Sequence, residues 1–361
     1  MLIRKYDLVD RAEIEVKLEL LKNVWYMAML SSELKPGKMK SCVMMNEPIV
    51  FFKNKNGEVK ALRDICPHRG IPLSYGQLKG DEVECPYHGW KFDGSGVCTE
   101  IPSLCPGQDL DCRKIKVRSY PAKEQQGMIW VFFGEKNFDD TLAPPVPLME
   151  ALPMNARPQV ALSEIFPCHI DHAVIGLMDP AHGPFIHKSF LWRSEKSILE
   201  KCKKFGPVNF GFQMLRHQPS ANSKAYKILG KEKTTEITFT LPSVRVEHIK
   251  VGNKNLYSYT ALTPISEKET RIYQLLYWDL GWLTLIQPFV KKFAKFFLHQ
   301  DIQAVSRQQD GLKYDPSLML IKDADTQAKW YYALKEQWIL KQENPQAFEN
   351  PVKETELRWR S

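Results

Sequence analysis

Short apolar runs dominate the chain from residue 24 to about residue 133, and turn-forming residues separate them. The runs are rich in β-branched and aromatic residues, which favour strands. An Asn56-Gly57 pair lies between two of the runs and is typical of a hairpin turn. The pattern therefore predicts an all-β domain over residues 23–140. Its clearest strands are expected at residues 24–28, 43–45, 49–52 and 128–133.

The pattern changes on both sides of this block. Residues 7–22 carry apolar positions among charges and predict an amphipathic N-terminal helix within residues 1–22. The proline-rich segment at residues 143–147 marks a boundary. A second domain is expected over residues 150–361.

The second domain is predicted to combine helices with an antiparallel sheet. A helix-and-loop region is expected near residues 168–190, and alternation of apolar and polar residues then predicts strands. The last part of the chain looks helical, so the fold class is α+β. The expected strands are residues 235–241, 244–248, 257–262 and 271–277, and the expected helices are residues 283–309 and 326–340.

Composition narrows the class of protein only slightly. The chain has 361 residues, of which 43% are hydrophobic and 25% charged, as in ordinary globular proteins. No apolar run reaches the ~18 residues needed to span a bilayer, and the N-terminus has no apolar segment of the signal-peptide kind. The eight cysteines show no spacing that recommends disulfides, so a reducing, cytoplasmic setting is expected.

The formal net charge of +8 is the main surface property that composition gives. No block of five or six Lys and Arg residues and no nucleic-acid motif occurs, so a nucleic-acid partner is not expected. The charge suits either an acidic electron-carrier protein or a generally basic solvated surface. A basic amphipathic segment at residues 282–297 is interpreted as a packed helix or a pocket wall, and membrane contact is not expected.

Two short loops carry the strongest chemical signal. Cys66 is followed by His68 and Cys85 by His88, and sixteen residues separate His68 from Cys85. A Rieske [2Fe–2S] centre needs two thiolates on one iron and two imidazoles on the other. A Cys2His2 zinc site is the alternative, but zinc sites usually pair Cys with Cys and His with His. Each loop here combines one Cys with one His, which favours the cluster over zinc.

These loops resemble those of the Rieske family. In its respiratory-chain branch, each loop carries an additional Cys, and the two form a disulfide. The matching positions here are Ile71 and Tyr87. The loops are therefore similar to those of Rieske oxygenases, which implies a cluster toward the lower-potential end of the Rieske range. The cluster ligands that the resemblance implies are Cys66, His68, Cys85 and His88.

A second motif, Asp179-x-x-His182-x4-His187, lies in the second domain. Two His residues five positions apart point about 140° apart on a regular α-helix. Gly183-Pro184 lies between them and is expected to break the helix, so that both rings can point to one place. Asp179 precedes a proline and suits a helix N-cap. Taken alone, this motif also fits two unrelated His residues.

Downstream of a Rieske loop pair, the motif resembles the iron site of Rieske oxygenases. In that family, two His residues and one carboxylate hold a mononuclear Fe(II) and leave positions open for O2 and substrate. The resemblance makes His182 and His187 iron ligands. It makes Asp179 the carboxylate that links a cluster His of one subunit to an iron-ligand His of its neighbour. His88 is preferred over His68 as the residue that Asp179 reaches.

The third iron ligand is expected to be an Asp or Glu on a late helix. The family pattern of Gln-Asp, an apolar stretch and Gln-Gln fits residues 299–309, with Asp301 as the ligand and Asp310 as the competitor. Many O- and N-demethylating relatives have Asn three residues before the bridging Asp, where this chain has Gly176. This departure weakens any transfer of their substrates to this chain.

The resemblance implies the oxygenase (α) subunit of a multicomponent system of the small α-only type. A separate reductase, with or without a ferredoxin, would carry electrons from NAD(P)H to the cluster, and O2 would be the co-substrate. The catalytic domain is expected to be helix-grip-like and the assembly a homotrimer. A monooxygenase that hydroxylates or oxidatively demethylates is favoured over a dioxygenase.

The substrate is expected to be a mostly apolar, ring-containing small molecule, because Phe185, Phe190 and Trp192 follow the second motif. The competing interpretation is a Rieske-type electron-transfer protein without a competent mononuclear iron. The chain length and the Asp/His/His/Asp set speak against it, since an electron carrier needs only the first domain.

Overall fold

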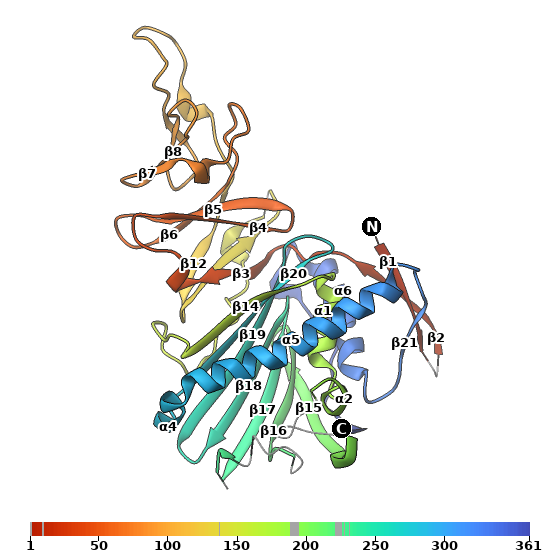
Figure 1. Cartoon of the computed structure of the whole chain (residues 1–361). Helices are drawn as coiled ribbons and strands as arrows, with labels where there is room; N and C mark the ends of the chain where they lie inside the picture. The colour runs from red at the N-terminus through yellow and green to blue at the C-terminus, as the bar shows by residue number, and fades with distance from the viewer. Residues whose placement is uncertain are drawn as a thin grey trace. The chain divides into compact units, whose positions relative to one another are not determined.

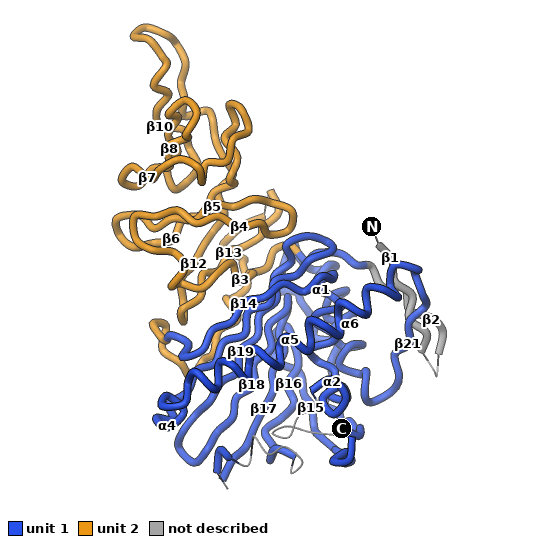
Figure 2. Tube along the Cα trace, in the orientation of Figure 1, with its two compact units in different colours: residues 1–21, 157–361 blue, residues 22–156 orange. Residues whose placement is uncertain are grey.

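The computed structural model describes residues 2–8, 11–136, 138–187, 195–220, 226, 228–230 and 232–361, with side chains from residue 18 onward. The chain forms two compact units, shown in different colours in Figure 2. One unit is residues 22–156, and the other combines residues 1–21 with residues 157–361.

The unit of residues 22–156 is built from short strands. They are β3 (Val24–Leu30), β4 (Met39–Met44), β5 (Glu47–Lys53), β6 (Val59–Arg63), β7 (Gln77–Lys79), β8 (Glu82–Glu84), β9 (Lys91–Phe92), β10 (Cys98–Glu100), β11 (Ser119–Tyr120), β12 (Ala122–Gln125) and β13 (Met128–Phe133). Short 3-10 helices lie at Ser31–Glu33, Leu73–Tyr75, Cys112–Lys114 and Asp140–Leu142.

These strands form three antiparallel sheets, with the orders β10-β9-β8-β7, β11-β6-β5-β4 and β12-β13-β3. All six residues of β13 are buried, as expected of a continuous apolar run in a central strand. The predicted turn at Asn56-Gly57 lies between β5 and β6, and Gly57 has a φ of +80°, which glycine adopts without strain. The all-β character of this unit is confirmed.

The second unit contains a large antiparallel sheet with the order β14-β20-β19-β18-β17-β16-β15-β22. Its strands are β14 (Val160–Phe166), β15 (Glu200–Val208), β16 (Gly211–His217), β17 (Lys233–Thr240), β18 (Val244–Val251), β19 (Lys254–Pro264), β20 (Thr270–Trp278) and β22 (Thr355–Arg360). Its helices are α1 (Ile170–Met178), α2 (Gly183–Ile186), α4 (Gly281–Leu285), α5 (Gln287–Leu312) and α6 (Thr326–Lys341). Further 3-10 helices lie at Glu195–Ser197 and Pro345–Ala347.

Helices of this unit pack against its sheet and one another. Helix α5 contacts β14, and α1 contacts β19, α5 and α6 (Figure 1). The strands predicted between residues 235 and 277 are confirmed as β17 to β20, and the two late helices as α5 and α6. Although α5 has 26 residues, no helix in the described part of the chain is long and apolar enough to cross a membrane.

The N-terminal helix expected over residues 7–22 is wrong. Two strands form instead, β1 (Leu2–Leu8) and β2 (Arg11–Leu18), and they pair antiparallel. Strand β1 also pairs in parallel with β21 (Leu318–Leu320), which joins this segment to the second unit. Residues 13–18 read Glu-Ile-Glu-Val-Lys-Leu, a strict alternation with the two-residue period of a strand.

Candidate functional site

The two Cys/His loops fold into the same turn, one after β6 and the other after β8. The backbone N–H groups of Cys66 and Cys85 each donate to the carbonyl five residues later, at 2.9 and 2.8 Å. Gly70 and Gly89 each donate back to the carbonyl of their Cys, with φ of +75° and +70°. Glycine adopts this left-handed region without strain. The shared Cys-Pro-x-x-Gly pattern therefore explains why both loops take one shape.

The four side chains of these loops gather as two buried thiols and two more accessible imidazoles. Cys66 and Cys85 are 1% and 2% exposed, whereas His68 is half-buried and His88 is exposed. The ring centroids of His68 and His88 are 4.6 Å apart. Burial raises the pKa of the Cys66 thiol to about 11, and the hydrogen-bonded Cys85 thiol acts in the same direction. Binding to iron would offset this cost of forming thiolates.

The loops fit a [2Fe–2S] cluster in two further respects. Backbone N–H groups of His68 and Arg69 donate toward the Cys66 sulfur, as suits a cluster thiolate. The buried Nδ1 of His68 makes no hydrogen bond within the described part of the chain. Trp90 stacks on the His68 ring at 4.6 Å and holds its orientation. An orphaned buried nitrogen in a fixed ring suits a metal ligand.

Two residues outside the motif hold the first loop in place. Asp64 is 4% exposed and accepts hydrogen bonds from the N–H and the hydroxyl of Ser74, at 2.7 and 2.5 Å. A Cβ on Gly76 would lie 1.9 Å from the carbonyl oxygen of Glu84, so only glycine permits this close approach to β8. Sequence reasoning did not identify either residue.

The second motif brings two imidazoles and one carboxylate together. The Nε2 atoms of His182 and His187 are 3.1 Å apart. Oδ1 of Asp301 lies 3.1 Å from Nε2 of His187 and 4.0 Å from Nε2 of His182. The three ligand atoms all lie within 4.8 Å of one another. Two imidazole nitrogens and a carboxylate around one point form the donor set of a non-haem iron site.

The local structure of this motif differs from the expectation in two ways. Gly183 and Pro184 begin α2 instead of breaking a helix, since proline is tolerated in the first helical turn. Asp179 is the C-cap of α1 and not an N-cap, and its Oδ1 accepts a hydrogen bond from the N–H of Ala181 at 2.7 Å. The two His rings meet because they flank the single turn of α2.

Each of these two imidazoles is oriented by a contact at Nδ1, the ring nitrogen that does not face the proposed metal. Nδ1 of His182 lies 2.7 Å from the carbonyl oxygen of Asp179, and Nδ1 of His187 lies 3.1 Å from Oε1 of Gln300. Because both partners are acceptors, each Nδ1 carries the hydrogen and each Nε2 presents its lone pair to the centre. Burial lowers the pKa of His182, although Asp179 and Asp301 act in the opposite direction. The neutral ring is the form that binds a metal.

The structure brings Asp301, and not Asp310, to the His pair. The side chain of Asp310 is 80% exposed and pairs with a neighbouring lysine. Phe297 lies four residues before Asp301 and stacks on His187, with the ring centroids 4.5 Å apart. Sequence reasoning missed the roles of Phe297 and Gln300, although four-residue spacing on a helix was an available signal for the first.

A cavity of about 400 Å³ opens beside the His/Asp group. Its walls come mainly from α1, α5, α6 and β21, and most of the described lining residues are aliphatic, with Phe166 as the aromatic member. Gln308, Asp325 and Gln327 add polar side chains to the lining. Phe185, expected to wall the pocket, is 52% exposed and does not line this cavity. Phe190 and Trp192 lie outside the described residues. The cavity therefore suits an apolar molecule, without the aromatic wall that was expected.

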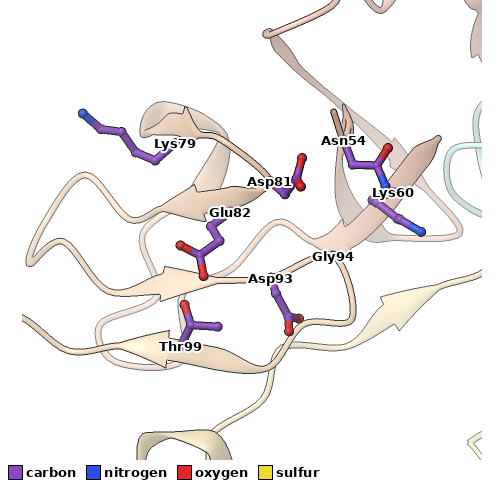
Figure 3. A pocket seen from close by; sticks show the side chains of 8 residues that line it. All are labelled: Asn54, Lys60, Lys79, Asp81, Glu82, Asp93, Gly94 and Thr99. Atoms are coloured by element: carbon purple, nitrogen blue, oxygen red, sulfur yellow. The ribbon is translucent and has the colours of Figure 1, made fainter. Parts of the chain in front are cut away.

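A second hollow, of about 390 Å³, lies in the unit of residues 22–156 (Figure 3). Lys60 and Lys79 line it together with Asp81, Glu82 and Asp93. The Asp93 carboxylate accepts backbone N–H bonds at 2.8 and 3.1 Å, so it serves to fix a turn. This hollow contains no residue of the two motifs and is not the candidate site.

Comparison with known proteins finds one domain family in each part of the chain. The profile of the Rieske [2Fe-2S] domain matches residues 24–121, and that of the vanillate O-demethylase oxygenase C-terminal domain matches residues 167–339. The chain belongs to the Rieske oxygenases. This family carries a Rieske cluster and a mononuclear iron, so both cofactors expected from the motifs are confirmed at the level of the family.

The relatives of this Rieske oxygenase include a chlorophyllide oxygenase and a methylsterol monooxygenase. Chlorophyllide a oxygenase of Arabidopsis thaliana is 31% identical over 311 residues, which are 81% of this chain and 53% of the relative. The 4beta-methylsterol monooxygenase of Methylococcus capsulatus is 40% identical over 129 residues, which are 36% of this chain and 35% of the relative. The chain spans about half the length, or less, of the curated relatives it matches.

A solved structure shows the same α+β fold. The structure of Pseudomonas putida CBB5 NdmA with caffeine superimposes with a TM-score of 0.71 at 20% identity, and the match covers 92% of this chain and 96% of NdmA. The prediction of an all-β Rieske domain followed by a domain with helices and an antiparallel sheet is confirmed.

Proposed function

We propose that the chain is the oxygenase component of a multicomponent Rieske system that hydroxylates, or oxidatively demethylates, a mostly apolar ring-containing small molecule. The observation that carries this proposal is the convergence of His182, His187 and Asp301 beside a cavity with aliphatic walls. Chlorophyllide and methylsterol, named in the two relatives, are ring-containing molecules.

The proposal assigns two sets of metal ligands. When bound, the mononuclear iron supplies the activation of O2 that the protein side chains lack. The cluster is assigned to Cys66, His68, Cys85 and His88, and the mononuclear iron to His182, His187 and Asp301.

Asp179 is proposed to link the two centres. Its Oδ2 lies 3.8 Å from Nδ1 of His182, and its side chain is 34% exposed, so its carboxylate can reach a residue of another subunit. His88 is the proposed cluster residue on the neighbouring subunit, because its ring is the more exposed of the two. This arrangement implies a ring of identical subunits, proposed as a homotrimer. It also places the Asp179 carboxylate between the two imidazoles, where it can serve as an electron path.

The chain is proposed to depend on a separate electron source. A reductase, with or without a ferredoxin, would pass electrons from NAD(P)H to the cluster. The aliphatic cavity would position the substrate and keep water from the metal centre. Monooxygenation is preferred because demethylation, which the matched C-terminal family names, follows from hydroxylation of a methyl group.

Single-turnover experiments with labelled O2 test this function. The reduced holoprotein is mixed with a panel of apolar ring compounds and, as a matched set, small charged amines. The proposal expects a product that contains one atom from O2, formed only with the apolar compounds. Turnover with the charged amines alone would contradict the substrate class, and two incorporated atoms would contradict monooxygenation. A His182→Ala variant, in which one proposed ligand is missing, is the inactive control.

A further inference from the structure

The start of α5 and the preceding α4 expose large apolar side chains. Leu285, Phe289 and Phe296 are 84%, 74% and 51% exposed. Trp282 and Ile286, beside them, are 39% and 38% exposed. The sequence interpretation of this segment as a packed helix or a pocket wall is therefore wrong for these five side chains.

Helical geometry places the exposed aromatic residues on the outer side of α5. Phe289, Phe293 and Phe296 follow an i, i+4, i+7 spacing, which puts them on one face of the helix. Leu298 and Val305, which are buried, lie on the opposite face by the same 100° rotation per residue. The inner face is thus already packed. The outer face is apolar where a solvated helix carries polar residues, and such patches mark interaction sites.

The same segment is basic. Lys291, Lys292 and Lys295 are exposed, and residues 280–300 contain no Asp or Glu. Lys295 lies 3.9 Å from Glu164, but its side chain remains 66% exposed. Trp, Phe and Leu side chains flanked by Lys on a short helical segment are the pattern of helices that lie in the interface of anionic membranes.

We propose that this surface docks on an anionic lipid bilayer. We call it the α4–α5 face. A second copy docked face to face through the same surface fits less well, because two such faces would bring lysines together without any acidic partner. Lysine is also depleted in the cores of protein interfaces. The α4–α5 face consists of Trp282, Leu285, Ile286, Phe289 and Phe296, and Lys291, Lys292 and Lys295 extend from the other sides of the same helical turns.

Aromatic contacts connect the α4–α5 face with the candidate metal centre. The ring centroids of Phe296 and Phe297 are 6.4 Å apart, and Phe297 stacks on His187 at 4.5 Å. Docking would therefore hold the metal centre near the lipid. One extension of the docking proposal rests on the proposed function. An apolar substrate would then reach the metal centre directly from the membrane. Docking itself does not depend on turnover.

Vesicle flotation of the full-length holoprotein tests the docking. The vesicles contain phosphatidylglycerol and phosphatidylcholine in equal parts, or phosphatidylcholine alone. The protein is expected to float with the anionic vesicles, and less so as salt screens its lysines. An L285S/F289S variant is expected to lower the partition coefficient by roughly tenfold or more, because two large apolar side chains are lost. Leu340→Ser, at a 67% exposed position on α6, is the matched control and should bind normally.

Other outcomes would overturn the proposal. The proposal fails if the unsubstituted protein does not float, or if it floats equally with both vesicle types. It also fails if L285S/F289S floats as well as the unsubstituted protein. A changed oligomeric state of that variant in analytical ultracentrifugation would also overturn it, because a second copy would then be the occupant. A K291Q/K292Q/K295Q variant, which leaves the apolar side chains intact, should lose the preference for anionic vesicles. None of these results depends on oxygenase activity.

Discussion

The rings of His182 and His187 are oriented by hydrogen bonds to atoms that are not themselves proposed metal ligands. The Asp179 carbonyl and the Gln300 amide oxygen each hold an Nδ1, at 2.7 and 3.1 Å. The spacing of the two His residues is visible in the sequence, and it sufficed to identify them. Gln300 could not be assigned, because its contact depends on how α5 packs beside α2.

Loss of the Gln300 contact should weaken iron binding. In Gln300→Leu, Nδ1 of His187 loses its acceptor, and we expect a roughly 10–100-fold lower iron affinity. Competition with an Fe(II) chelator measures this affinity. Gln303→Leu, at an exposed position on the same helix, is the control and should bind iron normally. Equal affinities of the two variants would show that the contact does not orient the ring.

The carboxylate of Asp179 should matter for electron transfer and not for metal content. In Asp179→Asn, the backbone carbonyl that holds His182 is unchanged, so both metals should remain bound. Turnover should fall by about 10–100-fold, since the charged link between the centres is lost. Iron analysis and coupled O2 uptake measure the two effects, with Asp310→Asn as the surface control. Full turnover with native coupling would refute the bridging role.

Helix α1 carries Asp179 at its C-terminal end and is anchored at its N-terminal end. Asp171 is fully buried and accepts bonds from Nζ of Lys335 and the hydroxyl of Tyr331, both at 2.6 Å. Both donors come from α6. This network fixes the orientation of α1, and the second motif begins at the C-terminal end of that helix.

Removing the lysine should leave a buried carboxylate without its counter-charge. We expect Lys335→Met to lower the free energy of unfolding by about 3–5 kcal/mol, measured by urea denaturation. The double variant D171N/K335M should regain most of this loss, because no buried charge then remains unpaired. A loss under 1 kcal/mol in the single variant, on the scale of an exposed pair, would show that the anchor is weak.

The N-cap of α1 predicts a pH dependence. Nδ1 of His169 accepts the Asp171 N–H at 3.2 Å, which requires an unprotonated ring, and burial lowers the pKa of His169. The unfolded chain therefore takes up the proton first as pH falls below about 6.5. This part of the stability is present above that pH and is lost as pH falls toward the lower folded pKa.

Amide hydrogen exchange of α1 should report this loss. The protection of residues 170–178 is expected to decline as pH falls below about 6.5, and a His169→Asn variant should show a flatter decline, since Asn caps without titrating. Equal pH dependence in both proteins would show that His169 contributes nothing to it.

The strands that the sequence predicted correctly are those with a clear two-residue period or a long apolar run, such as β13 and β17 to β20. Strand β15 was missed because it contains Lys201, Lys203 and Lys204 in place of an apolar pattern. Its pairing with β22 depends on a segment from the end of the chain. The β1–β2 pair was predicted as a helix because the apolar positions were noted but their two-residue period was not.

For the whole molecule, the two metal groups differ in how far the sequence alone identifies them. The four proposed cluster ligands lie in two neighbouring loops of one unit, so their pattern is local. Asp301 lies far from His187 in the chain, and the family resemblance favoured it over Asp310. The packing of α5 brings Asp301, and not Asp310, to the two His residues.

Iron and acid-labile sulfide per chain, measured on anaerobically purified protein, show whether the chain holds both a Rieske cluster and a mononuclear iron. A Rieske cluster together with a mononuclear site gives about three irons and two sulfides per chain. We expect this ratio in the unsubstituted protein, and about two irons and two sulfides in His182→Ala. Two irons and two sulfides in the unsubstituted protein, unchanged by added Fe(II), would favour an electron-transfer protein. Zinc without sulfide would contradict the assignment of a [2Fe–2S] cluster and of a mononuclear iron to this chain.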